Sequence, residues 1–160
     1  MNKHLISGFM LVVVLTLITT ASTLRADETI SGIPRVLNST TMMVDNKTVR
    51  LDYIYSLKPG SKCVWKNRPL DCGVLATAGL KDLVAGAKAI CRQNTSGKYT
   101  CTAGGYDLAY GLIHAGWAVP NSTAPARYFN KQERSKKRQL GLWSATNPDG
   151  KTIAALISEH

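Results

Sequence analysis

Thr40–Lys58 reads TTMMVDNKTVRLDYIYSLK and decides how the rest of this 160-residue chain is interpreted. Thr41–Val44 is a short apolar run, and Asp45-Asn46 after it is typical of a tight turn. Thr48–Tyr55 then alternates in character. The alternation predicts one strand face with Val49, Leu51 and Tyr53 and an opposite face with Arg50, Asp52 and Ile54. The segment is therefore predicted to be a β-meander.

The regions on either side of this meander differ in kind. Ile30–Val36 is predicted to be a first strand, interrupted by Gly32 and Pro34. Ser56–Cys72 is rich in proline, glycine and basic residues, so it is predicted to be a loop.

Helical spacing of apolar residues appears at Gly73–Val84, and Gly86 is expected to end that helix. Two strands follow, Lys88–Arg92 and Tyr99–Thr102. The turn-forming tetrapeptide Asn94–Gly97 lies between them, so the two strands are predicted to form a hairpin.

Two further helices are predicted towards the C-terminus. Asp107 is the expected cap of the first, and the second spans roughly Ala126–Leu140. The polar face of the second carries Lys131, Arg134, Lys136, Lys137 and Arg138. The tail from Asn147 is expected to be loosely held. This order of strands and helices predicts an α+β domain, for which a five-stranded barrel with packed helices is the natural closed form.

Residues 1–26 have the layout of a secretory signal peptide. A short basic start precedes the apolar run Leu5–Ala21, and cleavage is expected after Ala26, with Ala21 as an alternative. The competing interpretation is a retained membrane anchor, although the run is short of the roughly 20 apolar residues that a span requires. Cleavage would give a periplasmic or secreted protein with no stable membrane span.

Without residues 1–26, the chain is long enough for one compact domain, assigned to residues 27–146, followed by a tail over residues 147–160. These two parts hold 18 of the 20 basic residues and all 10 acidic ones, a net charge of +8. Such a surface attracts polyanions such as nucleic acid, anionic lipid or acidic polysaccharide, and also acidic proteins.

All four cysteines follow the predicted signal peptide, an even number that indicates disulfides in an exported chain. Three pairings are possible. The favoured one joins Cys63 to Cys72 and Cys91 to Cys101, because the members of each pair are close in sequence. A zinc site is disfavoured, since the chain has no Cys-x-x-Cys and the predicted domain contains only one histidine, His114.

Several short motifs occur in order along the chain. They are Val49-Arg50-Leu51, Cys72-Gly73 with Ala76, Leu80 and Leu83, Ala103–Leu108, Gly116-Trp117-Ala118, Tyr128, Ser135-Lys136 and Gly141-Leu142-Trp143. Together they resemble the motifs of the thermonuclease (staphylococcal nuclease-like) family, in its exported, cysteine-containing branch. The resemblance runs from about Ile30 to Ser144, nearly all of the predicted mature chain. It implies an oligonucleotide/oligosaccharide-binding (OB) barrel with three helices.

The same resemblance implies a degenerate active site. The family's calcium-binding acids fall on Leu37, Ser39 and Tyr55, and its general base falls on Lys58. The second of its two arginines falls on Ser96. Only Arg50 matches the catalytic set. Because calcium requires oxygen ligands, the resemblance predicts no catalytic residue beyond Arg50, no metal site and no cofactor.

Three further polar side chains, Asp52, Lys98 and His114, are given no catalytic role. Asp52 lies two residues after Arg50 on the predicted strand, so a local ion pair between them is the simplest expectation, with phosphate binding by Arg50 as the alternative. Lys98 is the cation nearest to the missing arginine, but it lacks the bidentate geometry of a guanidinium group. His114 is expected to be a surface or half-buried structural residue.

The leading hypothesis is therefore an exported domain that binds an anionic ligand or an envelope protein without catalysis. Its candidate ligand-binding residues are Arg50, Tyr55, Lys58 and Lys98. The basic residues of the first long loop and of the last helix are further candidates, and stacking on bases is expected of Tyr53, Tyr55, Trp65 and Tyr99. Alternatively, Tyr55 and Tyr53 plug the face of the barrel.

Two rival functions are retained. One is an active calcium-dependent nuclease or phosphodiesterase with a rearranged site, the only hypothesis that requires calcium. The other is a purely structural or interaction protein that is indifferent to polyanions. Salt dependence separates this last hypothesis from polyanion binding, which weakens steeply as salt rises.

Overall fold

The structure, a computed structural model, describes residues 28–158. The predicted signal peptide and its alternative as an anchor lie outside the described residues. Within residues 28–158, no helix combines the length and the apolar character needed to cross a membrane.

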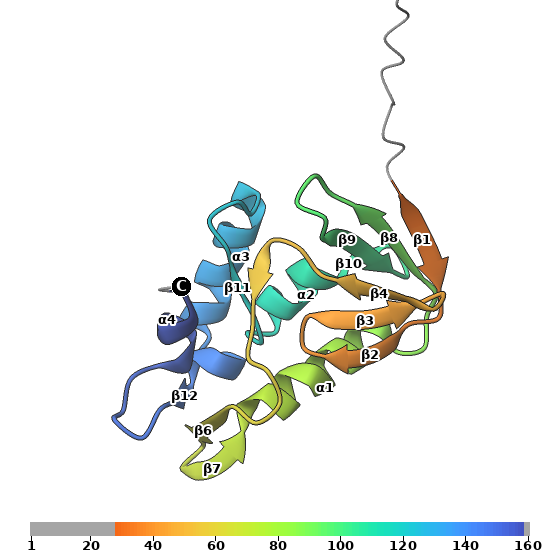
Figure 1. The fold of residues 1–160 in the computed structure, drawn as a ribbon. Coiled ribbons are helices and arrows are strands. Elements are labelled where there is room, and N and C mark those ends of the chain that lie inside the picture. Colours follow the sequence, from red (N-terminus) through yellow and green to blue (C-terminus); the bar gives the residue numbers. More distant parts are fainter. Residues whose placement is uncertain (1–27, 159–160) are drawn as a thin grey trace, which may run out of the picture.

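The chain is an α+β protein with several antiparallel sheets and four α-helices (Figure 1). One helix more is present than the resemblance implies, because the tail forms α4. A single-turn 3₁₀ helix, η1, precedes it at Gly141–Trp143. The α-helices are α1 (Cys72–Val84), α2 (Leu108–His114), α3 (Ala126–Lys137) and α4 (Ile153–Ser158).

The predicted meander forms the three-stranded sheet β2 (Arg35–Asn38), β3 (Thr41–Val44) and β4 (Lys47–Arg50). The turn between β3 and β4 is at Asp45-Asn46, as predicted, and both residues have positive φ, at 48° and 58°. Such a two-residue turn matches the twist of an antiparallel hairpin. Met42, Val44 and Val49 are buried and face the core.

A second sheet has the order β1–β8–β9–β10, with all neighbours antiparallel. Its strands are β1 (Thr29–Gly32), β8 (Ala89–Gln93), β9 (Tyr99–Ala103) and β10 (Tyr106–Asp107). The predicted first strand is thus divided between two sheets at Ile33-Pro34. The hairpin predicted around Asn94–Gly97 is confirmed. A parallel bridge from Leu51 to Tyr99 connects the two sheets, but the pairing within residues 28–158 does not form one closed barrel.

The prediction of one alternating strand over Thr48–Tyr55 is wrong beyond Leu51. Tyr53 has a φ of 68° and breaks the extended chain, and a separate short strand, β5 (Ile54–Tyr55), pairs with β11 (Val119–Pro120). Asp52 is consequently buried, whereas Arg50, predicted to share its face, is exposed.

The predicted loop over Ser56–Cys72 contains a hairpin instead, formed by β6 (Lys62–Trp65) and β7 (Arg68–Asp71). Its turn residues Lys66 and Asn67 have φ values of 49° and 60°. Pro69 is compatible with a strand here because β7 is an edge strand with β6 as its one neighbour in the sheet. Proline content alone was therefore a misleading signal.

Two cores hold these elements together. The larger lies between the two main sheets and the helices α1 and α2, and the smaller lies beneath the β6–β7 hairpin, η1 and α4. The prediction of a loosely held tail is wrong, because Ile153 and Ala154 are buried in the smaller core. β12 (Ala145–Thr146) pairs with β6 and brings the tail back to this core.

Both favoured disulfides are confirmed: Cys63 is bonded to Cys72, and Cys91 to Cys101. The first joins β6 to the start of α1, and the second crosses the β8–β9 pair. No cysteine of the described residues is free. Two disulfides are compatible with an extracellular or periplasmic protein.

We expect replacement of Cys63 and Cys72 together by alanine to lower the free energy of unfolding by about 2.5–3 kcal/mol, the chain-entropy value for so short a loop. Chemical denaturation of the oxidised proteins measures this difference. Replacement of both Cys91 and Cys101 is the matched comparison, because the sequence separations are 9 and 10 residues. A loss below about 1 kcal/mol in both variants would contradict a stabilising role for the bonds.

Candidate functional site

The four candidate ligand-binding residues come from three segments of the chain, namely the end of β4, the loop before β9, and β5 with the loop after it. Arg50 ends β4, and the residue after it, Leu51, bridges to Tyr99, which follows Lys98. The Leu51 amide donates to the carbonyl of Thr40 at 2.8 Å. Tyr55 lies on β5, and Lys58 lies in the loop after it.

The hydroxyl groups near the expected calcium site are turned inward. Ser39, at the position of an expected acid, is buried and donates its hydroxyl to the carbonyl of Leu57 at 2.6 Å. Ser56 donates to the carbonyl of Trp117, also at 2.6 Å. These bonds fasten the segment between β5 and β6 to the rest of the protein, so both hydroxyls have a structural role.

Asp52 is the buried carboxylate of this region, and the predicted ion pair with Arg50 is wrong. One carboxylate oxygen of Asp52 accepts from the Asn94 side-chain amide at 2.9 Å and from the Ser96 hydroxyl at 2.6 Å. The other accepts from the Tyr53 amide at 2.8 Å. Two of these donors belong to the loop between β8 and β9. Asp52 therefore holds in place the loop on which the family's second arginine is expected.

The charge of Asp52 is stabilised by this network. Burial by itself would raise the pKa of the carboxyl group, but the hydrogen bonds from Ser96, Asn94 and the Tyr53 amide outweigh it. Together with the nearby Lys98, they lower the pKa of Asp52 below its ordinary value. A carboxylate so fully bonded has a positioning role, and its oxygens are already committed to protein donors.

The expected stacking residues differ in accessibility. Tyr99 is buried, with 7% of its surface exposed, and Tyr53 packs edge-on against Tyr128 with ring centroids 6.0 Å apart. Trp65 donates its indole N–H to Ser144 and packs against Trp117. The prediction of a free stacking face is therefore wrong for Tyr99, whereas Tyr53 and Trp65 are half-buried. Tyr55 is more accessible, with 37% of its surface exposed.

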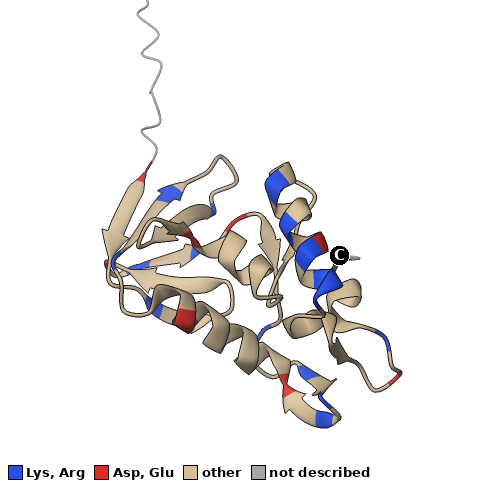
Figure 2. Ribbon diagram, turned by 180° about the vertical axis from the view of Figure 1, so that it is seen from behind, with Lys and Arg blue, Asp and Glu red and all other residues tan. Residues whose placement is uncertain are grey.

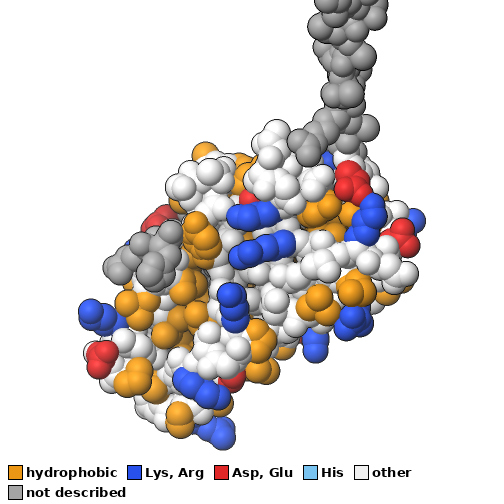
Figure 3. Space-filling view, viewed as in Figure 1, with side chains coloured by type: hydrophobic (Ala, Val, Ile, Leu, Met, Phe, Trp, Pro, Cys, Tyr) orange, Lys and Arg blue, Asp and Glu red, His pale blue; other side chains and the backbone are white. Residues whose placement is uncertain are grey.

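The cations of the candidate set remain accessible. Arg50 and Lys58 are exposed, and Lys98 is half-buried beside Asp52. Figure 3 shows a line of Lys and Arg side chains down the middle of the face that it draws, with apolar side chains on both sides. Among the described residues, no group of three or more His, Cys, Asp or Glu side chains is placed to hold a metal ion.

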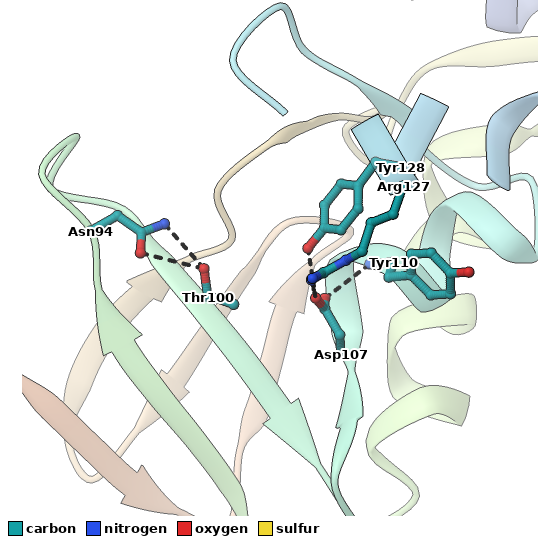
Figure 4. A network of polar contacts seen from close by, with 6 residues as sticks. All are labelled: Asn94, Thr100, Asp107, Tyr110, Arg127 and Tyr128. Atoms are coloured by element: carbon teal, nitrogen blue, oxygen red, sulfur yellow. Dashed lines mark hydrogen bonds and ion pairs between the residues drawn. The ribbon is translucent and has the colours of Figure 1, made fainter. Parts of the chain in front are cut away.

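A second polar network joins β10, α2 and α3. Asp107 caps α2, as predicted, by accepting from the Tyr110 amide at 3.0 Å. Its other carboxylate oxygen accepts from the Tyr128 hydroxyl at 2.6 Å and from Arg127 at 2.8 Å (Figure 4). Burial and the Asp107 charge raise the pKa of Tyr128, which therefore remains protonated and acts as a donor. The capping motif was visible in the sequence, whereas its link to α3 was not.

His114 is exposed, at the end of α2, in agreement with a surface position. Its Nδ1 lies 3.3 Å from the hydroxyl of Tyr106. Burial, Lys131 and Arg138 lower its pKa. The sequence placed the basic residues of the last helix on a polar face but did not reveal that His114 lies beside them.

The chain was compared with models of known protein families and with curated proteins. Neither comparison found a match.

Proposed function

We propose that this chain is an exported, thermonuclease-like domain that binds an anionic ligand without hydrolysing it. One observation carries the proposal. At the positions of the expected active site, the hydroxyl groups of Ser39 and Ser96 are committed to internal hydrogen bonds, whereas the cations Arg50 and Lys58 are exposed. Such a surface attracts polyanions but offers no ligands to a divalent cation.

The proposal includes a five-stranded OB-type barrel in which β1 and β2 together form the first strand and β3, β4, β8 and β9 form the other four. Three facts support it. The chain passes from one sheet to the other between β1 and β2, and the Leu51–Tyr99 bridge joins β9 to the segment after β4. In addition, β10 pairs only with Thr102 and Ala103, which leaves the start of β9 free for that contact. Barrels of this type bind oligonucleotides and oligosaccharides.

The ligand proposed for this surface is a flexible polyanion, either single-stranded nucleic acid or an acidic polysaccharide, in the periplasm or outside the cell. Arg50, Lys98 and Lys58 would contact the charged backbone. Tyr55 is the exposed aromatic residue of the candidate set and offers a ring on which a base or sugar packs. An acidic envelope protein would satisfy the same charges.

We expect the mature domain to bind a labelled oligothymidylate, with an affinity that falls steeply between about 50 and 200 mM salt. The triple variant Arg50→Gln/Lys58→Gln/Lys98→Gln should reduce the slope of log affinity against log salt by about 2, the value for three lost contacts to a single strand. Fluorescence anisotropy measures both quantities.

Single replacements of the three cations and of Lys151, an exposed lysine before α4, provide charge-matched controls. Equal effects of all four single replacements would show that the attraction is diffuse and that no site exists at Arg50. Hydrolysis of the same oligonucleotide that requires calcium and stops with EDTA would establish the alternative, an active nuclease with a rearranged site. If the oligonucleotide does not bind at any salt concentration, the purely structural hypothesis is favoured.

A further inference from the structure

The end of α2 and the C-terminal half of α3 border a cavity of about 290 Å³. Figure 2 shows how basic residues follow one another along α3. The cavity is lined by His114, Lys131, Arg134, Ser135, Lys137, Arg138 and Leu140. Five of these seven side chains carry a positive charge or can acquire one.

The helical repeat explains why these side chains meet. Lys131 and Arg134 on α3 and Arg138, its C-cap residue, are spaced i, i+3, i+7, so they project from one side of this helix. Buried Ser135 fixes that face against α2, because its hydroxyl lies 2.7 Å from the Ile113 carbonyl oxygen and 3.0 Å from that of His114. The geometry of the cavity is therefore set by the contact between two helices and not by a loop.

The positive charge of the cavity is not neutralised locally. Within residues 28–158, no carboxylate lines it, and the ion pairs of this part of the chain involve other cations, at Lys47, Lys62 and Arg127. Basic residues at a helix C-terminus also complement the helix dipole, but that dipole corresponds to only about half a negative charge. Four permanent cations exceed what the dipole can balance, so an anion would be strongly favoured here.

A second cavity, of about 260 Å³, adjoins the first and shares His114, Arg138 and Leu140 with it. Its other walls include Leu83 and Tyr106. The Tyr106 ring is 42% exposed and packs edge-on against Tyr110. A cationic cavity thus continues into one with an aromatic and aliphatic wall, and together they approach the size of ordinary small-molecule sites.

We propose that these two adjoining cavities bind a small phosphate monoester. Its phosphate group lies among Lys131, Arg134 and Arg138, and a ring attached to it lies against Tyr106. A phosphate monoester carries about −1.5 to −2 charges at pH 7, which suits several cations, and guanidinium groups bind its oxygens in pairs. This site goes beyond the proposed function, because α2 and α3 carry none of Arg50, Lys58 and Lys98.

His114 gives this site a titratable reporter. The groups that face it are the Tyr106 hydroxyl and the cations of α3 and its cap, Lys131, Arg134, Lys137 and Arg138. Without a ligand, burial, Lys131 and Arg138 lower its pKa. A bound dianion opposes these cations and favours the imidazolium form, so binding raises the pKa of His114 and takes up a proton.

Phenyl phosphate, inorganic phosphate and phenol are suitable probes for titration calorimetry with the full-length mature chain. We expect phenyl phosphate to bind more tightly than phosphate by at least about threefold, since the ring adds apolar contact, and phenol not to bind detectably. The double variant Lys131→Gln/Arg138→Gln should weaken phenyl phosphate binding by at least about tenfold, the size expected for lost charged hydrogen bonds. In nuclear magnetic resonance titrations, phenyl phosphate should raise the pKa of His114 in the unmodified protein but not in the double variant.

The single replacements Lys131→Gln and Lys136→Gln provide the matched comparison. Both lysines are on α3 and each lies over an aromatic ring, Lys131 over Tyr110 and Lys136 over Trp143, but of the two it is Lys131 that lines the cavity. Equal losses from these two replacements, equal affinity for phosphate and phenyl phosphate, or no binding at all would each overturn the proposal. Oligothymidylate binding in the same variants shows whether the surface around Arg50 acts independently, so failure at one site is distinguishable from failure at the other.

Discussion

We expect replacement of Gly116 by alanine to lower the free energy of unfolding by about 4 kcal/mol or more. Few mechanisms destabilise a protein this strongly, and strain at a special backbone conformation is one of them. Gly116 follows α2 with a φ of 79°. A Cβ atom there would overlap the backbone carbonyl of Leu140, which is not free to move because the segment continues into η1. The Leu142 amide also donates to the Gly116 carbonyl at 2.9 Å. The two backbones are therefore in direct contact at this point.

Gly86 provides a matched control for this substitution. Its φ is 73°, close to that of Gly116, but nothing lies within 4 Å of the position that a Cβ atom would take. Gly86→Ala should lower the free energy of unfolding by about 1–2 kcal/mol, the cost of holding a residue with a Cβ atom in the left-handed backbone conformation. Urea denaturation of the two variants measures the difference, which isolates the steric overlap. Equal losses of unfolding free energy in the two variants would show that the backbone contact between Gly116 and Leu140 relaxes without cost.

Asp52→Asn is expected to lower the free energy of unfolding by about 2–3 kcal/mol, because hydrogen bonds to a charged group are lost and an amide N–H₂ replaces an acceptor. The carboxylate of Asp52 accepts from Asn94, Ser96 and the Tyr53 amide, and it is 3% exposed. The loop between β8 and β9 should lose amide-exchange protection in this variant. Asp82→Asn on the exposed face of α1 is the control and should have little effect.

The effect of Asp52→Asn should also depend on pH. The pKa of Asp52 in the folded protein lies below the ordinary value of 3.8, so its contribution to stability is complete well above that pH. The contribution is lost as the pH falls through the folded-state pKa. Denaturation curves at pH 7 and at successively lower pH should therefore converge for the unmodified protein and the variant. A difference that stays constant down to pH 2 would contradict a charged Asp52.

The features that the sequence predicted correctly are local ones. Helix α1 follows from apolar periodicity, the Asp45-Asn46 and Asn94–Gly97 turns follow from residues that favour turns, and the Asp107 cap follows from its position before a helix. Each depends on residues within a few positions of one another. The disulfide pairs also join cysteines close in sequence, which is why proximity sufficed to choose among three pairings.

The errors arose where distant residues compete with local preference. The positive φ of Tyr53 ended the predicted strand, and hydrogen bonds from residues 42 and 44 positions away turned Asp52 into the core. In the C-terminal tail, Pro148-Asp149-Gly150 suggested a loose segment, but Ile153 is buried in the smaller core and begins α4. These outcomes depend on which surfaces meet in the folded chain.

The sequence by itself determined the α+β class of this protein, the favoured pairing of its cysteines and its basic charge, because these depend on residue types and short spacings. Only the tertiary structure decided which polar groups are left for a ligand. It turned Ser39 and Asp52 inward, left Arg50 exposed, and placed His114 beside the cations of α3. Packing controls these choices, since a buried oxygen requires a partner and the nearest partner comes from a distant part of the chain.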